Sequence, residues 1–125
     1  MKLILIIFAI SLLSCKSSKS ETKPLVMEDT IKFGSINWTD TLQINHEIKN
    51  LNDFDVKIEK VSSSCDCINA KILDSTIKSG NSSKIQLTYS PQSFNDSGYV
   101  VKFVPIRTSL NNEIKMIYLA GNVIK

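Results

Sequence analysis

The stretch "TLQINHEIKN", residues 41–50, decides the fold class because apolar and polar side chains alternate along it with a period of two. Leu42, Ile44, His46 and Ile48 share one side, and the polar residues between them share the other. Successive side chains of a β-strand point to opposite faces of a sheet, so the stretch predicts a strand with one buried face. His46 is expected on that face as a partly buried, hydrogen-bonded residue.

The same alternation returns in later stretches that are separated by turn-forming residues. These stretches are "FDVKIEKV" (54–61), "KIQLTY" (84–89) and "MIYLAGNV" (116–123), with a longer apolar run in "YVVKFVPIRT" (99–108). The residues expected to face the core are Leu42, Ile44, Ile48, Phe54, Val56, Ile58, Ile85, Leu87, Ile117 and Leu119. About seven short antiparallel strands, with no helical period between them, predict an all-β, immunoglobulin-like β-sandwich over residues 30–125.

Three residues predict local features of this sandwich. Val61 arrives one residue out of phase with Val56, so a bulge or a strand end is expected there. Pro105 has no N–H to donate to a ladder, so its run should bend or lie at a sheet edge. Trp38 is expected to pack at a connection between strands.

The N-terminus has the pattern of an export signal. Lys2 precedes an apolar run, residues 3–13, that is too short to cross a bilayer core of about 20 helical residues. The run ends in "LLSC", which resembles the bacterial lipobox and implies that Cys15 is lipid-modified and becomes the mature N-terminus. We therefore expect a lipoprotein signal peptide over residues 1–14 and a lipidated, flexible tether over residues 15–29.

The residues after Cys15 predict where the anchor lies. Lys16 stands where an aspartate is associated with retention in the inner membrane, and "KSSKS" (16–20) lacks an acidic signal for surface export. The expected location is the outer membrane, facing the periplasm, with the membrane contacted through the lipid on Cys15.

Several stretches together carry a family resemblance. In order they are "IKFGSI" (31–36), "HEIKNLNDFDVKIEKVSSSCDC" (46–67), "IKSG" (77–80), "KIQLTYSP" (84–91), "SGYVVKFVPIRTS" (97–109) and "IYLAGNV" (117–123). The chain resembles the domain of unknown function 1573 family over residues 31–123. The resemblance implies a short exported protein, often a lipoprotein of Bacteroidetes and related bacteria, with an immunoglobulin-like sandwich and no assigned reaction.

The pair Cys65 and Cys67 in "SSSCDCIN" (62–69) is the candidate site for chemistry. In an ideal strand their Cα atoms lie about 6.6 Å apart, near the upper limit for a disulfide, and a turn would bring the sulfurs closer. Export permits a disulfide. The pair has three interpretations at this stage: a local disulfide or packed thiols with a structural role, thiol redox chemistry, or binding of a soft metal ion such as Cu(I).

Composition argues against several function classes. The formal net charge is +3, with 15 Lys and Arg interspersed among 12 Asp and Glu, so a nucleic-acid partner is not expected. No nucleophile and base stand in a catalytic pattern, and Asp53 with Asp55 fall in a turn where solvated carboxylates are the norm. No phosphate-binding glycine motif is present. We expect no catalytic residue, no cofactor and no enzyme activity.

The sequence therefore predicts a lipid-anchored β-sandwich that serves as a binding or assembly module of the cell envelope. Its expected mechanism is presentation of a sheet edge or end loops to another envelope protein. The alternative is a thiol redox or copper-handling protein that uses Cys65 and Cys67.

Overall fold

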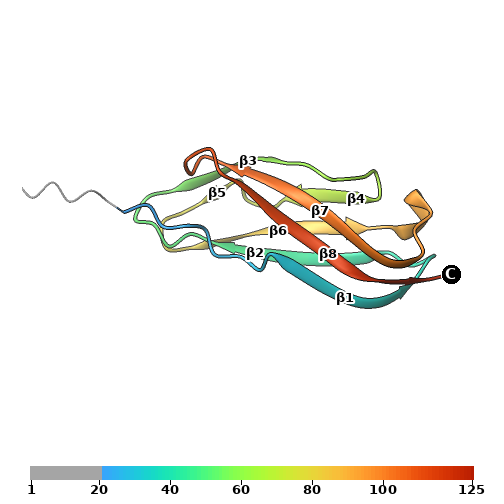
Figure 1. The fold of residues 1–125 in the computed structure, drawn as a ribbon. Helices are drawn as coiled ribbons and strands as arrows, with labels where there is room; N and C mark the ends of the chain where they lie inside the picture. The colour runs from blue at the N-terminus through green and yellow to red at the C-terminus, as the bar shows by residue number, and fades with distance from the viewer. Residues whose placement is uncertain (1–20) are drawn as a thin grey trace, which may run out of the picture.

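The computed structural model describes residues 21–125, which form two β-sheets packed against one another (Figure 1). The predicted signal peptide and Cys15 lie outside these residues. The elements are β1 (Thr30–Asn37), β2 (Leu42–Lys49), β3 (Val56–Val61), β4 (Ile68–Ile72), β5 (Thr76–Ile77), β6 (Ser82–Tyr89), the 3-10 helix η1 (Pro91–Phe94), β7 (Gly98–Thr108) and β8 (Ile114–Ile124). The predicted all-β sandwich is confirmed.

The larger sheet has the strand order β1-β8-β7-β3-β5, and the smaller sheet has the order β2-β6-β4. Neighbouring strands are antiparallel except β1 and β8, which run parallel. The predicted antiparallel arrangement is confirmed for the other neighbouring pairs, and β1 with β8 is the exception. The physical reason is that the segment before β1 enters the larger sheet at the same end where β8 begins (Figure 1).

The strands run along the length of the molecule, so their connections gather at two ends (Figure 1). We call the end where residue 21 enters the entry end, and it carries the connections 50–55, 78–81 and 109–113. The connection 73–75 crosses between the sheets partway along the molecule, where Leu73 bonds to Lys84 and Ser75 to Ile58. We call the opposite end the far end, and it carries the connections 38–41, 62–67 and 90–97 together with the C-terminus.

The core lies between the two sheets and agrees with the alternation of the sequence. Buried as predicted are Ile48, Val56, Ile58, Ile85, Leu87, Ile117 and Leu119, each at most 3% exposed. Leu42 and Ile44 are partly buried and pack against this core. Phe54 is a correction: it precedes β3 in a connection and is 40% exposed, because the strand begins only at Val56.

The register of β3 shifts between Ile58 and Lys60, and the strand ends at Val61, as its phase predicted. Of the two alternatives for Pro105, a bend or a sheet edge, the edge is wrong, since β7 runs through it in the interior of the larger sheet. Ser62 donates its N–H to the Pro105 carbonyl at 3.0 Å, just beyond the end of β3. Because Pro105 lies where β3 is ending, its missing N–H removes little from the ladder.

The folded domain begins earlier than residue 30, which corrects the predicted extent of the tether. Leu25 is 5% exposed and belongs to the core, and Val26 exchanges two backbone hydrogen bonds with Lys49, both 2.9 Å long. The backbone carbonyl of Asp29 accepts the N–H of Tyr118 at 2.7 Å. The three apolar residues Leu25, Val26 and Met27 follow one another without alternation, so no period in the sequence predicts which of them is buried.

A close contact fixes β1 on β8. The ring of Phe33 lies so near Gly121 that a Cβ there would stand 2.2 Å from the ring. The same ring packs against the fully buried Tyr89, with 5.7 Å between ring centroids. Gly121 is therefore required because the Phe33 ring packs directly against its Cα, and not because the chain turns there. Replacement of Gly121 by Ala would force Phe33 to move.

Candidate functional site

The connection between β3 and β4 holds the predicted cysteine pair. The structure joins Cys65 and Cys67 by a disulfide, with their Cα atoms 5.1 Å apart. This separation is shorter than in an ideal strand, because the chain turns at Cys65, whose carbonyl accepts the N–H of Ile68 at 3.4 Å. On the side of β7, Ser64 donates its N–H to the Phe103 carbonyl at 3.1 Å. On the side of β6, the Cys67 carbonyl accepts the N–H of Ser90 at 2.8 Å.

The two sulfurs have different surroundings. Cys67 is 2% exposed and belongs to the core cluster, whereas Cys65 is partly buried at its margin and Asp66 between them is exposed. Attack by an external thiol would have to begin at Cys65 and release the Cys67 thiolate into an apolar environment, which raises the pKa of a thiol and slows its departure. The surroundings therefore favour a structural role for the pair over rapid exchange.

The strand that follows the cysteines has one open edge. Ser90 donates to the carbonyl of Cys67, and Leu73 donates to that of Lys84 at 3.2 Å. Because Ile68 lies opposite Tyr89 in the register, the backbone N–H and C=O groups of alternate residues of β4, Asn69 and Lys71, point toward β6. The N–H and C=O groups of Ala70 and Ile72 consequently point away from β6. No other strand of residues 21–125 pairs with β4 on that side.

An open cleft of about 370 Å³ lies beside this edge, between the end of β3 and the start of β4. Its polar wall is formed by Ser62, Ser63, Asp66 and Asn69, and its apolar wall by Val61, Ile68 and Ala70. The cleft exists because β5, which pairs with β3 only at Val56 and Lys57, does not reach this part of the sandwich. An extended chain could therefore lie against β4 with its side chains in a partly apolar groove.

The other sheet edges differ from that of β4. On β2, Val26 pairs with Lys49, and the edge lies beside an open cleft of about 420 Å³ whose lining includes Met27, Glu28 and Asn45. On β1, the register shifts between Lys32 and Gly34, where Gly34 has a φ of 74°. A bulge of this kind twists an edge and discourages pairing with another strand. β5 has only two residues.

His46 lies on β2 opposite Ile85, whereas the cysteines lie beyond the other edge of β6. The structure therefore does not bring His46 to Cys65 and Cys67. Burial lowers the pKa of His46, while Glu28 and Asp29 nearby, and a hydrogen bond to the Glu28 backbone, partly offset that effect. No group of three or more His, Cys, Asp or Glu residues gathers around a candidate metal position within residues 21–125.

Trp38 and His46 each keep one buried nitrogen without a hydrogen-bond partner in the described part of the chain, Nε1 of Trp38 and Nε2 of His46. Trp38 follows β1 as predicted for a packing residue, is partly buried against the core, and carries the Lys125 ammonium 5.1 Å from its ring centroid.

Two asparagines organise the entry end. Asn50 is fully buried and donates its side-chain amide to the carbonyls of Phe54 (2.8 Å) and Ile77 (3.0 Å). Its Oδ1 accepts the backbone N–H of Asn52 at 3.0 Å and the Asn52 Nδ2 at 2.9 Å. Asn52 in turn pairs with the Lys23 backbone, accepting the N–H at 2.7 Å and donating to the carbonyl at 2.9 Å.

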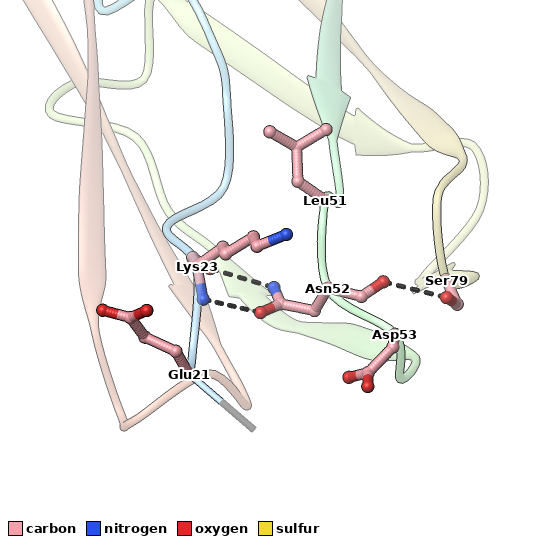
Figure 2. Close-up of a pocket in the computed structure, with 6 residues that line it drawn as sticks. All are labelled: Glu21, Lys23, Leu51, Asn52, Asp53 and Ser79. Atoms are coloured by element: carbon pink, nitrogen blue, oxygen red, sulfur yellow. Dashed lines mark hydrogen bonds between the residues drawn. The ribbon is translucent and has the colours of Figure 1, made fainter. Parts of the chain in front are cut away.

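Figure 2 shows this pairing at the mouth of a pocket of about 390 Å³. Ser79 closes the opposite side by donating its hydroxyl to the Asn52 carbonyl at 2.8 Å. The Asp55 carboxylate accepts the N–H of Ser79 at 3.0 Å, so the predicted solvated carboxylate is also a link between two connections. The pocket is wide and polar, and its hydrogen bonds serve to hold residues 21–25 in place.

The far end has its own buried polar group. Asp96 accepts the Tyr89 hydroxyl at 2.6 Å and the Lys102 ammonium at 2.8 Å. Burial, followed by the hydrogen bond and charge of Asp96, raises the pKa of Tyr89 well above its ordinary value of 10.0. The Lys102 ammonium also lies 4.6 Å from the centroid of the Phe94 ring, which ties η1 to β7.

The outer face of β7 and β8 was not predicted from the sequence. Residues 99–108 form one apolar run there, and the pattern alone does not distinguish its two faces. Tyr99, Val101 and Phe103 point outward and are 74%, 54% and 41% exposed. The signal was present, because a strand that is apolar on both faces usually has both faces covered.

Among residues 21–125 no helix has the length and apolar character required to span a bilayer.

Comparisons with other proteins agree with this architecture. The sequence profile of a family described as "Protein of unknown function (DUF1573)" matches residues 25–123. A search among curated proteins found no match. A protein of unknown function from Porphyromonas gingivalis W83 has a similar structure, with a TM-score of 0.72 at 15% identity over 82% of this chain and 48% of that protein. The chain thus spans about half the length of that protein.

Two further solved structures are similar at low identity. The ASH/PapD-like domain of human CEP192 gives a TM-score of 0.64 at 18% identity, over 86% of this chain and 92% of that domain. The periplasmic chaperone SfaE gives 0.51 at 8% identity, over 82% of this chain and 58% of the chaperone. At these identities the likeness concerns the immunoglobulin-like fold alone.

Proposed function

The chain belongs to the DUF1573 family, and we propose that it is a non-enzymatic binding module that captures an extended segment of another cell-envelope protein on the edge of β4. The observation that carries this proposal is the outward direction of the N–H and C=O groups of Ala70 and Ile72 beside an open cleft. Exposed backbone groups of an edge strand are a template for strand addition.

The side chains of β4 define the segment that would fit. Ile68, Ala70 and Ile72 face the space between the sheets, and Asn69 and Lys71 face outward. An added strand would alternate in the same way, with small or apolar side chains toward Ala70 and polar ones beside Lys71. Ser62 and Ser63 also line the cleft, and their hydroxyls can donate hydrogen bonds to polar groups of the segment or accept hydrogen bonds from them.

The anchor is part of the proposal. If Cys15 is lipidated, the seven residues between Lys16 and Thr22 span at most about 25 Å before Lys23 is held by Asn52. The domain would then stand with its entry end toward the outer membrane and its far end toward the periplasm. A periplasmic chaperone with a similar fold supports the use of this architecture in that compartment.

The β4 edge can be tested by removing one donor without disturbing the ladder. Ala70→Pro deletes an N–H that points away from β6, and an edge strand tolerates proline at such a position. A photo-crosslinking amino acid at Lys71 of the purified protein, mixed with solubilised native envelope, should form a protein adduct that Ala70→Pro reduces at least about tenfold, the loss of roughly 1.4 kcal/mol.

The control places the same crosslinker at Asn45 of β2, an outward position on the opposite edge of the smaller sheet. Thermal unfolding must show that Ala70→Pro remains folded. An adduct from Lys71 that persists unchanged in folded Ala70→Pro protein would exclude strand addition at β4.

The anchor has a separate test. Cys15→Ala should abolish lipid attachment, move the protein to the aqueous phase in detergent partitioning, and leave the folded domain intact. Full membrane association of this variant would remove the lipid-anchor proposal and leave the β4 proposal standing, because the two rest on different residues.

The alternative function, thiol redox or copper handling, rests on the partly accessible Cys65. The burial of Cys67 opposes it. Reduction by a monothiol at a rate comparable to that of exposed protein disulfides, or displacement of a Cu(I) chelator by the reduced protein, would favour this alternative over the β4 module.

A further inference from the structure

The outer face of the larger sheet carries a continuous apolar band. Six of the eleven large hydrophobic side chains exposed in residues 21–125 lie on it: Tyr99, Val101, Phe103, Ile114, Tyr118 and Ile124. The register places Phe103 opposite Tyr118, Val101 opposite Ala120 and Pro105 opposite Met116. Figure 1 shows β7 and β8 side by side along the molecule, so the band follows its length.

The core does not account for this band. Val104 and Ile106 of β7 and Ile117 and Leu119 of β8 point inward and are fully buried, so the core is complete without the outer side chains. Scattered hydrophobic residues are normal on a protein surface, but a contiguous set that includes three aromatic side chains is typical of an interaction site.

The charges at the margins of the band are mostly positive. On the outer face, β1 contributes Lys32, β3 contributes Lys57 and Lys60, and β7 contributes Arg107. The anion on these strands is Glu59, which lies 3.7 Å from Arg107. The outward positions of β7 and β8 between these margins, from Tyr99 to Pro105 and from Ile114 to Ile124, carry no charged side chain.

Two shallow hollows lie near the ends of the band, and each combines apolar walls with a cation. One, of about 220 Å³, is lined by Tyr99, Ala120 and Lys32. The other, of about 140 Å³, is lined by Pro105, Ile114, Arg107 and Lys60. Their positions on β7 differ by about eight residues, or roughly 26 Å along an extended strand.

We propose that this outer face is a docking surface for a protein partner whose contact surface is apolar at its centre and carries carboxylates near both ends. Apolar side chains of the partner would cover Val101, Phe103 and Tyr118, and its carboxylates would pair with Lys32 in one hollow and with Lys60 and Arg107 in the other. Complementary charge fixes the register of such a contact and discriminates against other partners.

The charges favour a heterologous protein over a second copy. Two copies placed face to face would bring the cationic margins of both together, with one carboxylate on each face already engaged by Arg107. A lipid surface also offers anionic groups, but it has no fixed projections to fill two hollows. The proposed surface belongs to β7 and β8, whereas the β4 edge belongs to the other sheet, so neither proposal depends on the other.

The test uses purified full-length protein with a photo-crosslinking amino acid at Val101, mixed with solubilised native envelope. The charge variant is Lys32→Glu with Lys60→Glu. Its matched control is Lys49→Glu with Lys84→Glu, which changes the net charge equally on the smaller sheet. We expect one protein adduct from Val101, at least about tenfold less of it in the charge variant, and less than about twofold change in the control.

Other outcomes overturn the proposal. They are absence of an adduct, an adduct equally abundant in the charge variant, and an adduct with the mass of two copies of this chain. Flotation of the protein without its lipid anchor (Cys15→Ala) with phosphatidylglycerol vesicles, lost in Lys32→Glu with Lys60→Glu, would assign the face to a membrane instead. Circular dichroism of each variant must show the same strand content as the parent protein.

Discussion

The two ends of the sandwich are held together by different chemistry. At the entry end, Asn50 and Asn52 join the connection 50–55 to β5, to Ser79 and to the segment before β1 through neutral hydrogen bonds. At the far end, a disulfide closes one connection and the buried Asp96 carboxylate fixes another. A network of amides forms only when all its segments are in place, whereas each link at the far end fastens a single loop. We therefore expect the hydrogen bonds of the entry end to be lost together when one member is removed, and the links of the far end to be lost separately.

Asn50→Ala is expected to have the largest effect on stability, because the Asn50 side chain makes the central hydrogen bonds of the entry end. The substitution leaves the buried carbonyls of Phe54 and Ile77 and the N–H of Asn52 without partners, and each such group costs about 1–3 kcal/mol. We expect the free energy of unfolding, measured with urea, to fall by about 3–5 kcal/mol. Ser79→Ala, which removes one partly buried donor, is the control and should cost no more than about 1.5 kcal/mol.

Asp96→Asn is expected to have the next largest effect, at the far end. Tyr89 and Lys102 contact different oxygens of the carboxylate, and asparagine places an NH₂ group, which cannot accept, at one of these two positions. Hydrogen bonds to a buried charge contribute about 1.5–3 kcal/mol. The same variant should lower the pKa of Tyr89, whose rise is caused first by burial and then by Asp96.

Because folding raises the pKa of Tyr89, its contribution to stability is complete below pH 10 and is lost as the pH rises above that value. Tyrosinate absorbance against pH, compared between the parent protein and Asp96→Asn, measures the shift. Identical titrations in the two proteins would contradict the assigned role of Asp96.

Removal of the disulfide should cost less. In the chain-entropy estimate a loop of three residues contributes about 1.6 kcal/mol. Cys65→Ser with Cys67→Ala should therefore lower the free energy of unfolding by roughly 1–3 kcal/mol and leave the fold intact. Thiol counting and intact mass of the parent protein must show the two cysteines oxidised to one another. Two free thiols would mean that packing alone orders this loop.

The smallest expected effect concerns His46, which lies on β2 between the two ends. Burial lowers its pKa below the ordinary 6.5 despite Glu28 and Asp29, so its contribution to stability is complete above pH 6.5 and is lost as the pH falls. His46→Leu should be less sensitive than the parent protein to a change from pH 7 to pH 5 in urea unfolding. An equal loss in both proteins would assign the acid sensitivity to carboxylates.

The sequence predicted those parts of the fold that rest on a local period. Ile44, Ile48, Ile85 and Leu87 alternate with polar residues, and their strands and inward-facing side chains follow from that pattern. Leu25 could not be placed in this way, because it stands in a short apolar run with Val26 and Met27 that shows no alternation.

The contacts that define the candidate sites come from segments distant in the sequence. The edge of β4 is open because β5, the next strand in the chain, begins only at Thr76 and pairs with β3 in the other sheet. The band on β7 is continuous because β8 lies beside it. The cysteine pair was recognised from its spacing, but the difference in burial between Cys65 and Cys67 depends on the strands packed around them.

The pairing of Asn52 with Lys23 has a mechanical consequence. A pulling force applied between residue 21 and the C-terminus at the far end acts along the strands (Figure 1). It therefore loads two sets of hydrogen bonds in shear, those between β1 and β8 and those of Val26 with Lys49. Bonds loaded in shear must rupture together, unlike bonds that are unzipped one at a time, and survival under force depends on the unfolding rate. The two hydrogen bonds between Asn52 and the Lys23 backbone hold the segment before β1 in place, so the force does not separate β1 from β8 one hydrogen bond at a time. The domain is therefore suited to stay folded while it carries tension between its two ends.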